Sequence, residues 1–229
     1  PGHKGLLHTA RVIRVRRHRC NVVKLARMNR FVRLLISACL FVLTVAPLRA
    51  ADGPVAVIEA LNKTLLQTLQ QSSGTTAATR YDRLKSPVSD AYNFARMISI
   101  IAGSAWTNAT PEQQEALLNA FARFSVANYA SRFKGYSGEE FEIVGTRPGV
   151  RDTTLVETRL VRTGGEPAVP ITYVFEEEDS RWRIIDVLLE RSISELALRR
   201  SEYAQTLRSG GIEALTPILN SKADEMLAS

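Results

Sequence analysis

Residues 168–190 read AVPITYVFEEEDSRWRIIDVLLE, the most informative segment of the 229-residue chain. Alternate residues of its first half are apolar: Val169, Ile171, Tyr173 and Phe175. This alternation is typical of a strand that buries one face. An acidic turn at 178–180 follows, and the second half is apolar on both faces, as in a covered central strand. The segment therefore predicts an antiparallel β-hairpin within a sheet.

Two more strands are predicted upstream of this hairpin, at 139–146 and 152–163. The hairpin strands themselves are expected at 168–177 and 181–190. The links between the strands are short and rich in glycine, proline or acidic residues, as expected of antiparallel connections. The block therefore predicts a four-stranded antiparallel sheet.

Helical periodicity flanks the strand block on both sides. Before it, helices are predicted at 54–71, 75–85, 88–102 and 110–133, with the second ending before Pro87. The last begins at a proline preceded by threonine and followed by glutamine in capping-box spacing. After the strands, the period returns in two helices separated by a glycine pair. The predicted fold class is α+β, with several helices packed on a four-stranded antiparallel sheet.

Residues 28–50 have the pattern of a secretory signal peptide: a basic start, the apolar run LLISACLFVLTVA at 34–46, and a small-residue exit at Ala50. At about 1.5 Å per residue this run covers about two thirds of a bilayer core of roughly 30 Å. A cleaved signal is therefore favoured over an uncleaved anchor. The predicted start is Met28, with residues 1–27 an upstream over-read and 51–229 the mature domain.

Removing the leader reverses the charge of the chain. The whole sequence has 30 basic and 23 acidic residues, a net charge of +7, but 11 of the basic residues and none of the acidic ones lie in 1–50. The mature domain therefore has a net charge of −4. Binding to nucleic acid loses its main support and is not predicted.

The mature domain contains neither histidine nor cysteine, because all three histidines and both cysteines lie in the leader. This excludes a Ser-His-Asp or Cys-His relay, a Cys or His zinc site and a disulfide within 51–229. No metal site and no cofactor is predicted. The remaining catalytic hypothesis is a hydrolase that uses carboxylates alone, with Glu140 beside Glu142 as the candidate pair.

The apolar content of the helices has two interpretations. The predicted 88–102 helix has one apolar face that includes Ile98 and a second made of Phe94, Met97 and Ile101. With the apolar face of the 168–177 strand, these residues either fill an ordinary core or line a hydrophobic cavity. Periodicity alone does not separate the two.

Several segments together resemble the MlaC family of periplasmic lipid-binding proteins, also called the toluene-tolerance auxiliary family. The segments that carry the resemblance are ATPEQQEA at 109–116, FARF at 121–124, YSGEEF at 136–141, WRIIDVLLE at 182–190, SEY at 201–203 and GGIEAL at 210–215. They span most of 54–226 in the family's order. The YSG and DVLL runs are most similar to the hopanoid-associated branch, HpnM.

The resemblance implies a periplasmic, non-enzymatic carrier whose helices and sheet enclose an apolar lipid cavity. Such a carrier binds a phospholipid or hopanoid by its hydrocarbon chains and moves it between the inner and outer membranes. The implied partners are an inner-membrane MCE-domain ABC transporter complex and an outer-membrane complex that donates or accepts lipid. An alternative is a non-lipid periplasmic adaptor that docks on the inner-membrane complex.

The residues expected to line the lipid site are chosen by helix or strand face and are not transferred from the family. They are Phe94, Ile98, Ile101, Phe121, Phe124, Tyr129, Tyr173, Phe175, Val187 and Tyr203.

Overall fold

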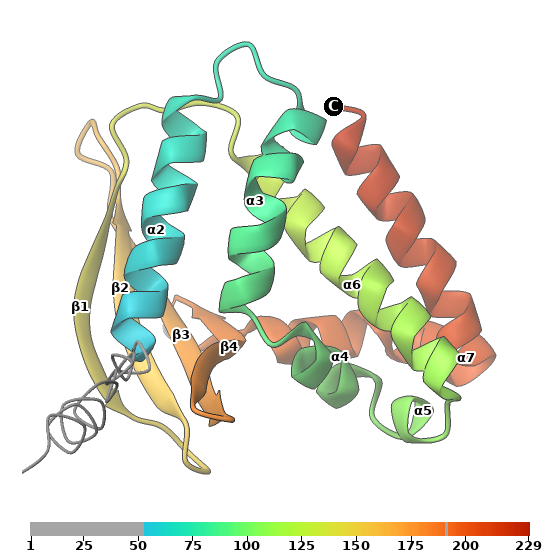
Figure 1. The fold of residues 1–229 in the computed structure, drawn as a ribbon. Coiled ribbons are helices and arrows are strands. Elements are labelled where there is room, and N and C mark those ends of the chain that lie inside the picture. The colour runs from blue at the N-terminus through green and yellow to red at the C-terminus, as the bar shows by residue number, and fades with distance from the viewer. Residues whose placement is uncertain (1–52, 191) are drawn as a thin grey trace, which may run out of the picture. The chain divides into compact units, whose positions relative to one another are not determined.

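A computed structural model describes residues 53–190 and 192–229. The predictions about the over-read, the signal peptide and its cleavage concern residues 1–50, which lie outside the described residues. The helices and strands, in chain order, are α2 (Pro54–Gln70), α3 (Ala77–Ala91), α4 (Phe94–Ala102), α5 (Ser104–Thr107), α6 (Pro111–Arg132), β1 (Glu140–Pro148), β2 (Thr154–Val161), β3 (Val169–Glu178), β4 (Arg181–Leu189), β5 (Ile193–Ser194) and α7 (Glu195–Leu227) (Figure 1).

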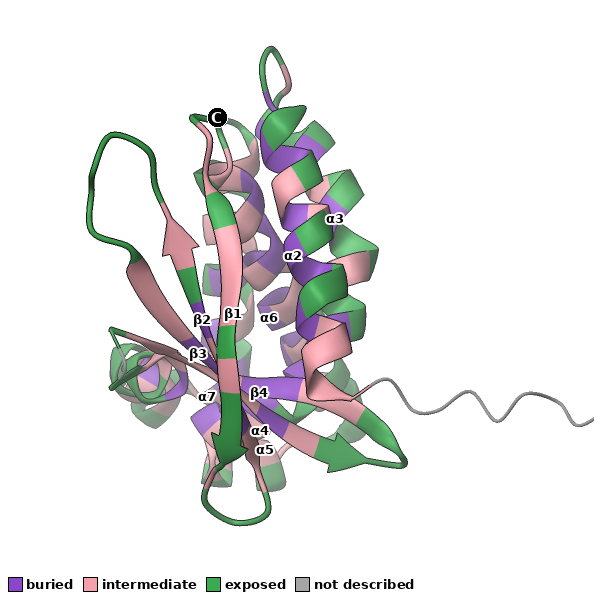
Figure 2. Cartoon of the chain, turned by 90° about the vertical axis from the view of Figure 1, so that its left-hand side faces the viewer, coloured by how far each residue is buried: buried purple, intermediate pink, exposed green. Residues whose placement is uncertain are grey.

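The strands form one antiparallel sheet in the order β1-β2-β3-β4-β5. The α+β class is confirmed, and the four predicted strands are present as β1 to β4. The predicted number of strands is wrong, because the sheet has a fifth, short strand, β5. β5 has two residues and pairs with the end of β4, with Leu188 opposite Ser194. The sequence does not reveal β5, because a strand of two residues is too short to show an alternation of apolar and polar side chains. Figure 2 shows β1 at the edge of the sheet, intermediate or exposed along its length.

The helices lie on one side of the sheet. In Figure 1 the sheet stands at the left, α2 lies next to it, and α3, α6 and the second part of α7 lie to the right. Their facing sides share a continuous buried core that includes Ile58, Leu84, Leu117 and Leu219. The predicted capping box at the start of α6 is confirmed: the Thr110 hydroxyl accepts from the backbone N–H of Gln113 at 3.3 Å, and the side-chain oxygen of Gln113 accepts from the backbone N–H of Thr110 at 2.8 Å.

The predicted break at Pro87 is wrong, and so is the continuous helix over 88–102. α3 runs through Pro87 and ends at Ala91, and Tyr92 has an extended backbone with φ −102° and ψ 143°. The backbone N–H of Asn93 donates to the carbonyl of Ile184 in β4, at 2.9 Å. The chain leaves the helix to make this contact with a strand that lies far away in sequence, and Asn93 then caps α4.

The glycine pair Gly210–Gly211 separates two helical segments, as predicted. Helical hydrogen bonding continues on both sides, so the two segments form α7, but Gly211 has φ 65° and ψ −156°. This conformation is open almost only to glycine. In Figure 1 α7 changes direction near this point. No helix within residues 53–190 and 192–229 is long and apolar enough to cross a membrane.

Candidate functional site

A cavity of about 700 Å³ lies between the inner face of the sheet and the helices. Such a volume is typical of ligand pockets. A methylene group takes about the space of a water molecule, roughly 30 Å³, so the cavity has room for on the order of 20 of them. Its apolar wall consists of Leu65, Leu69, Phe94, Met97, Ile101, Phe121, Phe124, Phe133, Phe141, Leu160, Val169, Ile171, Val187, Leu189 and Leu196.

Several aromatic rings lie on the helical side of this wall and contact one another. Tyr92 and Phe94 stack with ring centroids 5.5 Å apart and planes 6° apart. Phe94 meets Phe121 edge to face at 5.8 Å. Aromatic pairs at these distances add about 0.5–1.5 kcal/mol each beyond burial. These ring contacts tie Tyr92, at the end of α3, to α4 and α6 along the cavity wall.

Three tyrosine hydroxyls interrupt the apolar lining. The hydroxyl oxygens of Tyr92 and Tyr129 are 2.5 Å apart and share one hydrogen bond. Burial is the main cause that raises the pKa of Tyr92, Tyr129 and Tyr173. All three hydroxyls therefore stay protonated at neutral pH and do not act as bases.

Charged side chains form the rim of the cavity. Arg162 and Glu166, both exposed, pair at 3.0 Å in the turn between β2 and β3. Arg132, at the end of α6, donates from Nε to the side-chain oxygen of Asn128 at 3.1 Å. None of the ion pairs within residues 53–190 and 192–229 includes Arg132. The rim therefore offers a guanidinium that is available to an anionic group.

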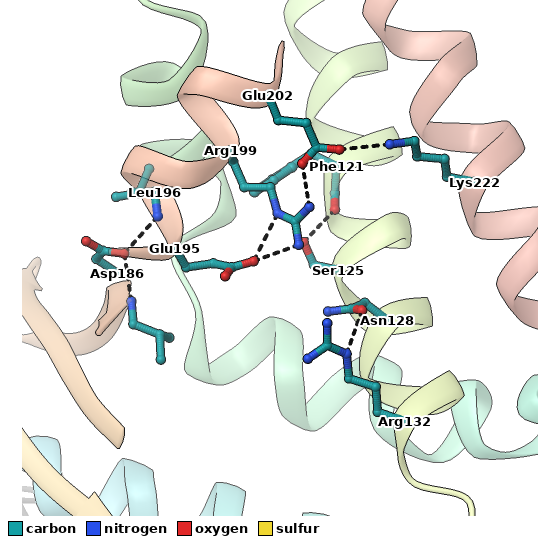
Figure 3. Close-up of polar contacts among 11 residues, drawn as sticks. Phe121, Ser125, Asn128, Arg132, Asp186, Glu195, Leu196, Arg199, Glu202 and Lys222 are labelled. Carbon is teal, nitrogen blue, oxygen red and sulfur yellow. Dashed lines mark hydrogen bonds and ion pairs between the residues drawn. The ribbon is translucent and has the colours of Figure 1, made fainter. Parts of the chain in front are cut away.

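Arg199 anchors a second charged cluster on the wall (Figure 3). Its guanidinium pairs with Glu195 and Glu202, each at 2.7 Å, and lies 5.2 Å from the ring centre of Phe124. Glu202 also pairs with Lys222 at 2.8 Å. Since Glu202 precedes Gly211 and Lys222 follows it, this cluster links the two parts of α7 across the bend.

Asp186 fixes where α7 begins. One carboxylate oxygen accepts from the backbone N–H groups of Val187 and Leu196, at 2.8 and 3.0 Å (Figure 3). The other accepts from the Ser194 hydroxyl at 2.6 Å. The Ser194 hydroxyl also accepts from Ala197 N–H at 3.0 Å and so caps the helix. Asp186 thereby holds the first turn of α7, and with it part of the cavity wall, against β4.

The structure brings seven of the ten predicted lining residues to the cavity: Phe94, Ile101, Phe121, Phe124, Tyr129, Tyr173 and Val187. The other three, Ile98, Phe175 and Tyr203, are buried in the core and do not line it. Ile98 lies about 100° around α4 from Met97, at the margin of the face that carries Phe94, Met97 and Ile101, and it is fully buried against the core.

The polar part of the wall was missed by the sequence analysis. Ser125, Asn128 and Arg132 follow one another at spacings of three and four on α6 and line the cavity (Figure 3). This spacing puts them on one helix face, so the signal was present. Glu195 and Arg199 are related in the same way on α7.

The carboxylate pair considered for hydrolysis does not lie at the cavity. Neither Glu140 nor Glu142 lines it, and Glu142 accepts a hydrogen bond from Arg159 on the neighbouring strand. Among residues 53–190 and 192–229, no group of three or more His, Cys, Asp or Glu side chains is placed to hold a metal ion.

Fold and cavity together define a small α+β protein built around an internal apolar pocket with a charged rim. Residues 59–221 match the family model described as MlaC protein. The chain belongs to the MlaC family.

A solved structure has the same fold. It is a phospholipid-binding protein from Ralstonia solanacearum, determined in complex with a phospholipid. The two chains are 18% identical, the match covers 77% of this chain and 98% of that one, and the TM-score is 0.64. At this identity the likeness establishes the fold, and the HpnM branch stays a prediction.

Proposed function

We propose that this protein is a lipid carrier that holds the hydrocarbon chains of a phospholipid or a hopanoid in the cavity and shuttles the lipid between the inner and outer membranes. The observation that carries this proposal is the apolar cavity of about 700 Å³ with a charged rim. Membership of the MlaC family supports it. So does the fold shared with a protein that was solved with a bound phospholipid.

The energetics of lipid transfer agree with such a cavity. A lipid with two chains has on the order of 30 methylenes, and exposing them to water costs about 0.8 kcal/mol each, or about 24 kcal/mol. An apolar cavity removes most of this cost without any charged group inside. Exchange with a membrane then changes the free energy little, so partner complexes set the direction.

The proposed location is the periplasm, reached through the predicted signal peptide. The proposed partners are an inner-membrane MCE-domain ABC transporter complex and an outer-membrane complex that donates or accepts lipid. The protein is proposed to act without catalysis and without a cofactor, with the lipid as its ligand. Of the predicted site residues, those on the cavity wall are proposed to contact lipid, and the three buried behind it to support the wall.

A non-lipid adaptor is the second candidate function. Ile193 in β5 and Leu198 in the first turn of α7 are 48% and 50% exposed and offer apolar side chains to a protein partner. An adaptor would need this surface and not the cavity.

Two tryptophan substitutions separate the candidates. Val187 lines the cavity, whereas Leu188, the next residue of β4, points to the opposite face of the sheet. Val187→Trp is expected to reduce the uptake of a fluorescent phospholipid from vesicles several-fold, and Leu188→Trp to leave it near the wild-type value. Equal uptake by both variants, or no uptake by the wild type, would count against the carrier.

A further inference from the structure

The three tyrosine hydroxyls in the cavity come from separate elements. Tyr92 follows α3, Tyr129 lies on α6 and Tyr173 lies in the middle of β3, and all three line the cavity. The Tyr92 and Tyr173 residues are less than 5% exposed. We call these three residues the hydroxyl cluster. A cavity that only held hydrocarbon would gain nothing from polar groups at this depth.

The hydroxyl cluster has more donors than the protein uses. Each tyrosine hydroxyl carries one proton. One proton is used in the bond between Tyr92 and Tyr129, and Tyr173 makes no side-chain hydrogen bond within residues 53–190 and 192–229. Two O–H donors therefore remain without a protein acceptor. Leaving a buried donor without a partner is unfavourable, so the cluster favours a ligand that brings acceptors.

Both charged and apolar residues of the cavity wall lie near the hydroxyl cluster. Tyr129 follows Asn128 of the polar row on α6, and its ring is 6.0 Å from Phe133 and 6.2 Å from Tyr92. The charges of Glu195, in the Arg199 cluster, and of Arg132, on the rim, also act on the pKa of Tyr129, after burial and the Tyr92 hydrogen bond, so both lie within electrostatic reach of it. Phe94, which belongs to the apolar wall, stacks on Tyr92.

A diacyl phospholipid brings hydrogen-bond acceptors as well as hydrocarbon. Its anionic phosphate is followed by two ester carbonyls and then by hydrocarbon chains. Each carbonyl oxygen accepts hydrogen bonds and has no proton to donate. The two carbonyls match the two spare donors of the hydroxyl cluster. A hopanoid ring system and an ether-linked lipid lack these carbonyls.

We propose that Tyr92, Tyr129 and Tyr173 form a subsite for the ester carbonyls of a diacyl lipid, so that the cavity prefers ester-linked lipids to ether-linked lipids and hopanoids. This inference rests on the proposed function, because it names the lipid class that the same cavity holds. The apolar wall supplies the affinity for chains, and the hydroxyl cluster supplies the choice among lipids.

The test measures a selectivity ratio. Protein loaded with a fluorescent phospholipid is mixed with vesicles of diester phosphatidylcholine or of diether phosphatidylcholine with equal chain lengths. For each lipid, the concentration that displaces half of the fluorescent phospholipid is measured. The selectivity ratio is the value for the diether lipid divided by the value for the diester lipid. Wild-type protein and Tyr173→Phe are compared, so that the contribution of the vesicles cancels. Tyr81→Phe is the matched control, since Tyr81 packs against the core from α3 and does not line the cavity.

Loss of one hydrogen bond is expected to lower the ester preference of Tyr173→Phe by roughly 2- to 12-fold, with no change in Tyr81→Phe. An unchanged ratio in Tyr173→Phe would overturn the subsite while leaving the carrier function intact. Failure of both lipids to displace the probe would overturn the proposed function and this inference with it.

A second measurement needs no variant. Infrared spectra of wild-type protein loaded with a lipid that carries ¹³C at both ester carbonyls report whether those carbonyls accept hydrogen bonds. The expected stretching frequency is that of a hydrogen-bonded ester. A band at the position found in dry hydrocarbon solvent would overturn the proposal, even if Tyr173→Phe does not fold.

Discussion

Replacing Asp186 with alanine should destabilise the protein because it releases the first turn of α7. The carboxylate accepts from the backbone N–H of Leu196, a buried residue, and from the Ser194 hydroxyl that caps the helix. Without Asp186 the Leu196 N–H, at a helix start, has no intrahelical acceptor. The negative charge at the helix N-terminus is lost as well.

The expected cost follows from these contacts. A hydrogen bond to a charged group contributes about 1.5–3 kcal/mol, and the helix-end charge about 0.3–1 kcal/mol. Because the bonds share one carboxylate, they do not add fully, and we expect a loss of about 3 kcal/mol in the free energy of unfolding. For a domain of this size each kcal/mol shifts the melting temperature by about 2–4 °C, so Tm should fall by about 6–12 °C.

The assay is thermal unfolding followed by circular dichroism, with two matched variants. Asp186→Asn keeps an acceptor oxygen without the charge and should lose about half as much. Asp90→Ala removes an exposed aspartate that accepts only from the Ser86 hydroxyl, at 3.2 Å, and should stay within about 0.5 kcal/mol of wild type. A Tm of Asp186→Ala equal to that of Asp90→Ala would refute the reasoning.

Three further predictions concern the bend, the buried hydroxyls and the ligand. Gly211→Ala should lose about 1–3 kcal/mol, because alanine is strained at φ 65° and ψ −156°, whereas Gly145→Ala, with open space around its added carbon and no positive φ, should be nearly neutral by urea titration. Equal stabilities would contradict the strain. Burial raises the pKa of Tyr92 and Tyr173 above the ordinary 10.0, so the native state binds more protons than the unfolded chain once the pH passes 10. Stability should therefore be constant just below pH 10 and fall above it, and replacing both tyrosines by phenylalanine should flatten that fall in pH-dependent melts; an equally steep fall in the double variant would contradict this cause. Extracting the lipid should lower Tm, since a ligand present at 100 times its Kd stabilises the folded state by about 2.7 kcal/mol, and adding phospholipid back should restore it. An unchanged Tm would argue against a ligand-bound native state.

The strands and most helix ends were predictable because their signals are local. Alternation in β3 and the capping residues of α6 are properties of a few neighbouring residues. The break at Tyr92 was not predictable in this way. It depends on a hydrogen bond to Ile184, about 90 residues further along the chain, and no local pattern encodes that contact.

The cavity wall was predictable only in part. The sequence shows that α4 is apolar on two faces, but it does not show which face meets empty space. Ile98 faces the core, and Met97, from the other face, lines the cavity. Both are buried apolar residues, so hydrophobicity does not distinguish a wall from a core. Whether an apolar residue lines the cavity or fills the core depends on how far the helices stand from the sheet at that point.

The most direct test of the carrier is native mass spectrometry of the full chain purified from its own cells without detergent. The account predicts a species heavier than the polypeptide by the mass of one lipid, which fragments to diacyl phospholipid if the hydroxyl cluster selects esters. It also predicts that Val187→Trp reduces this species relative to Leu188→Trp. A wild-type protein that is free of lipid, and that accepts none from phospholipid or hopanoid vesicles, would contradict the central claim.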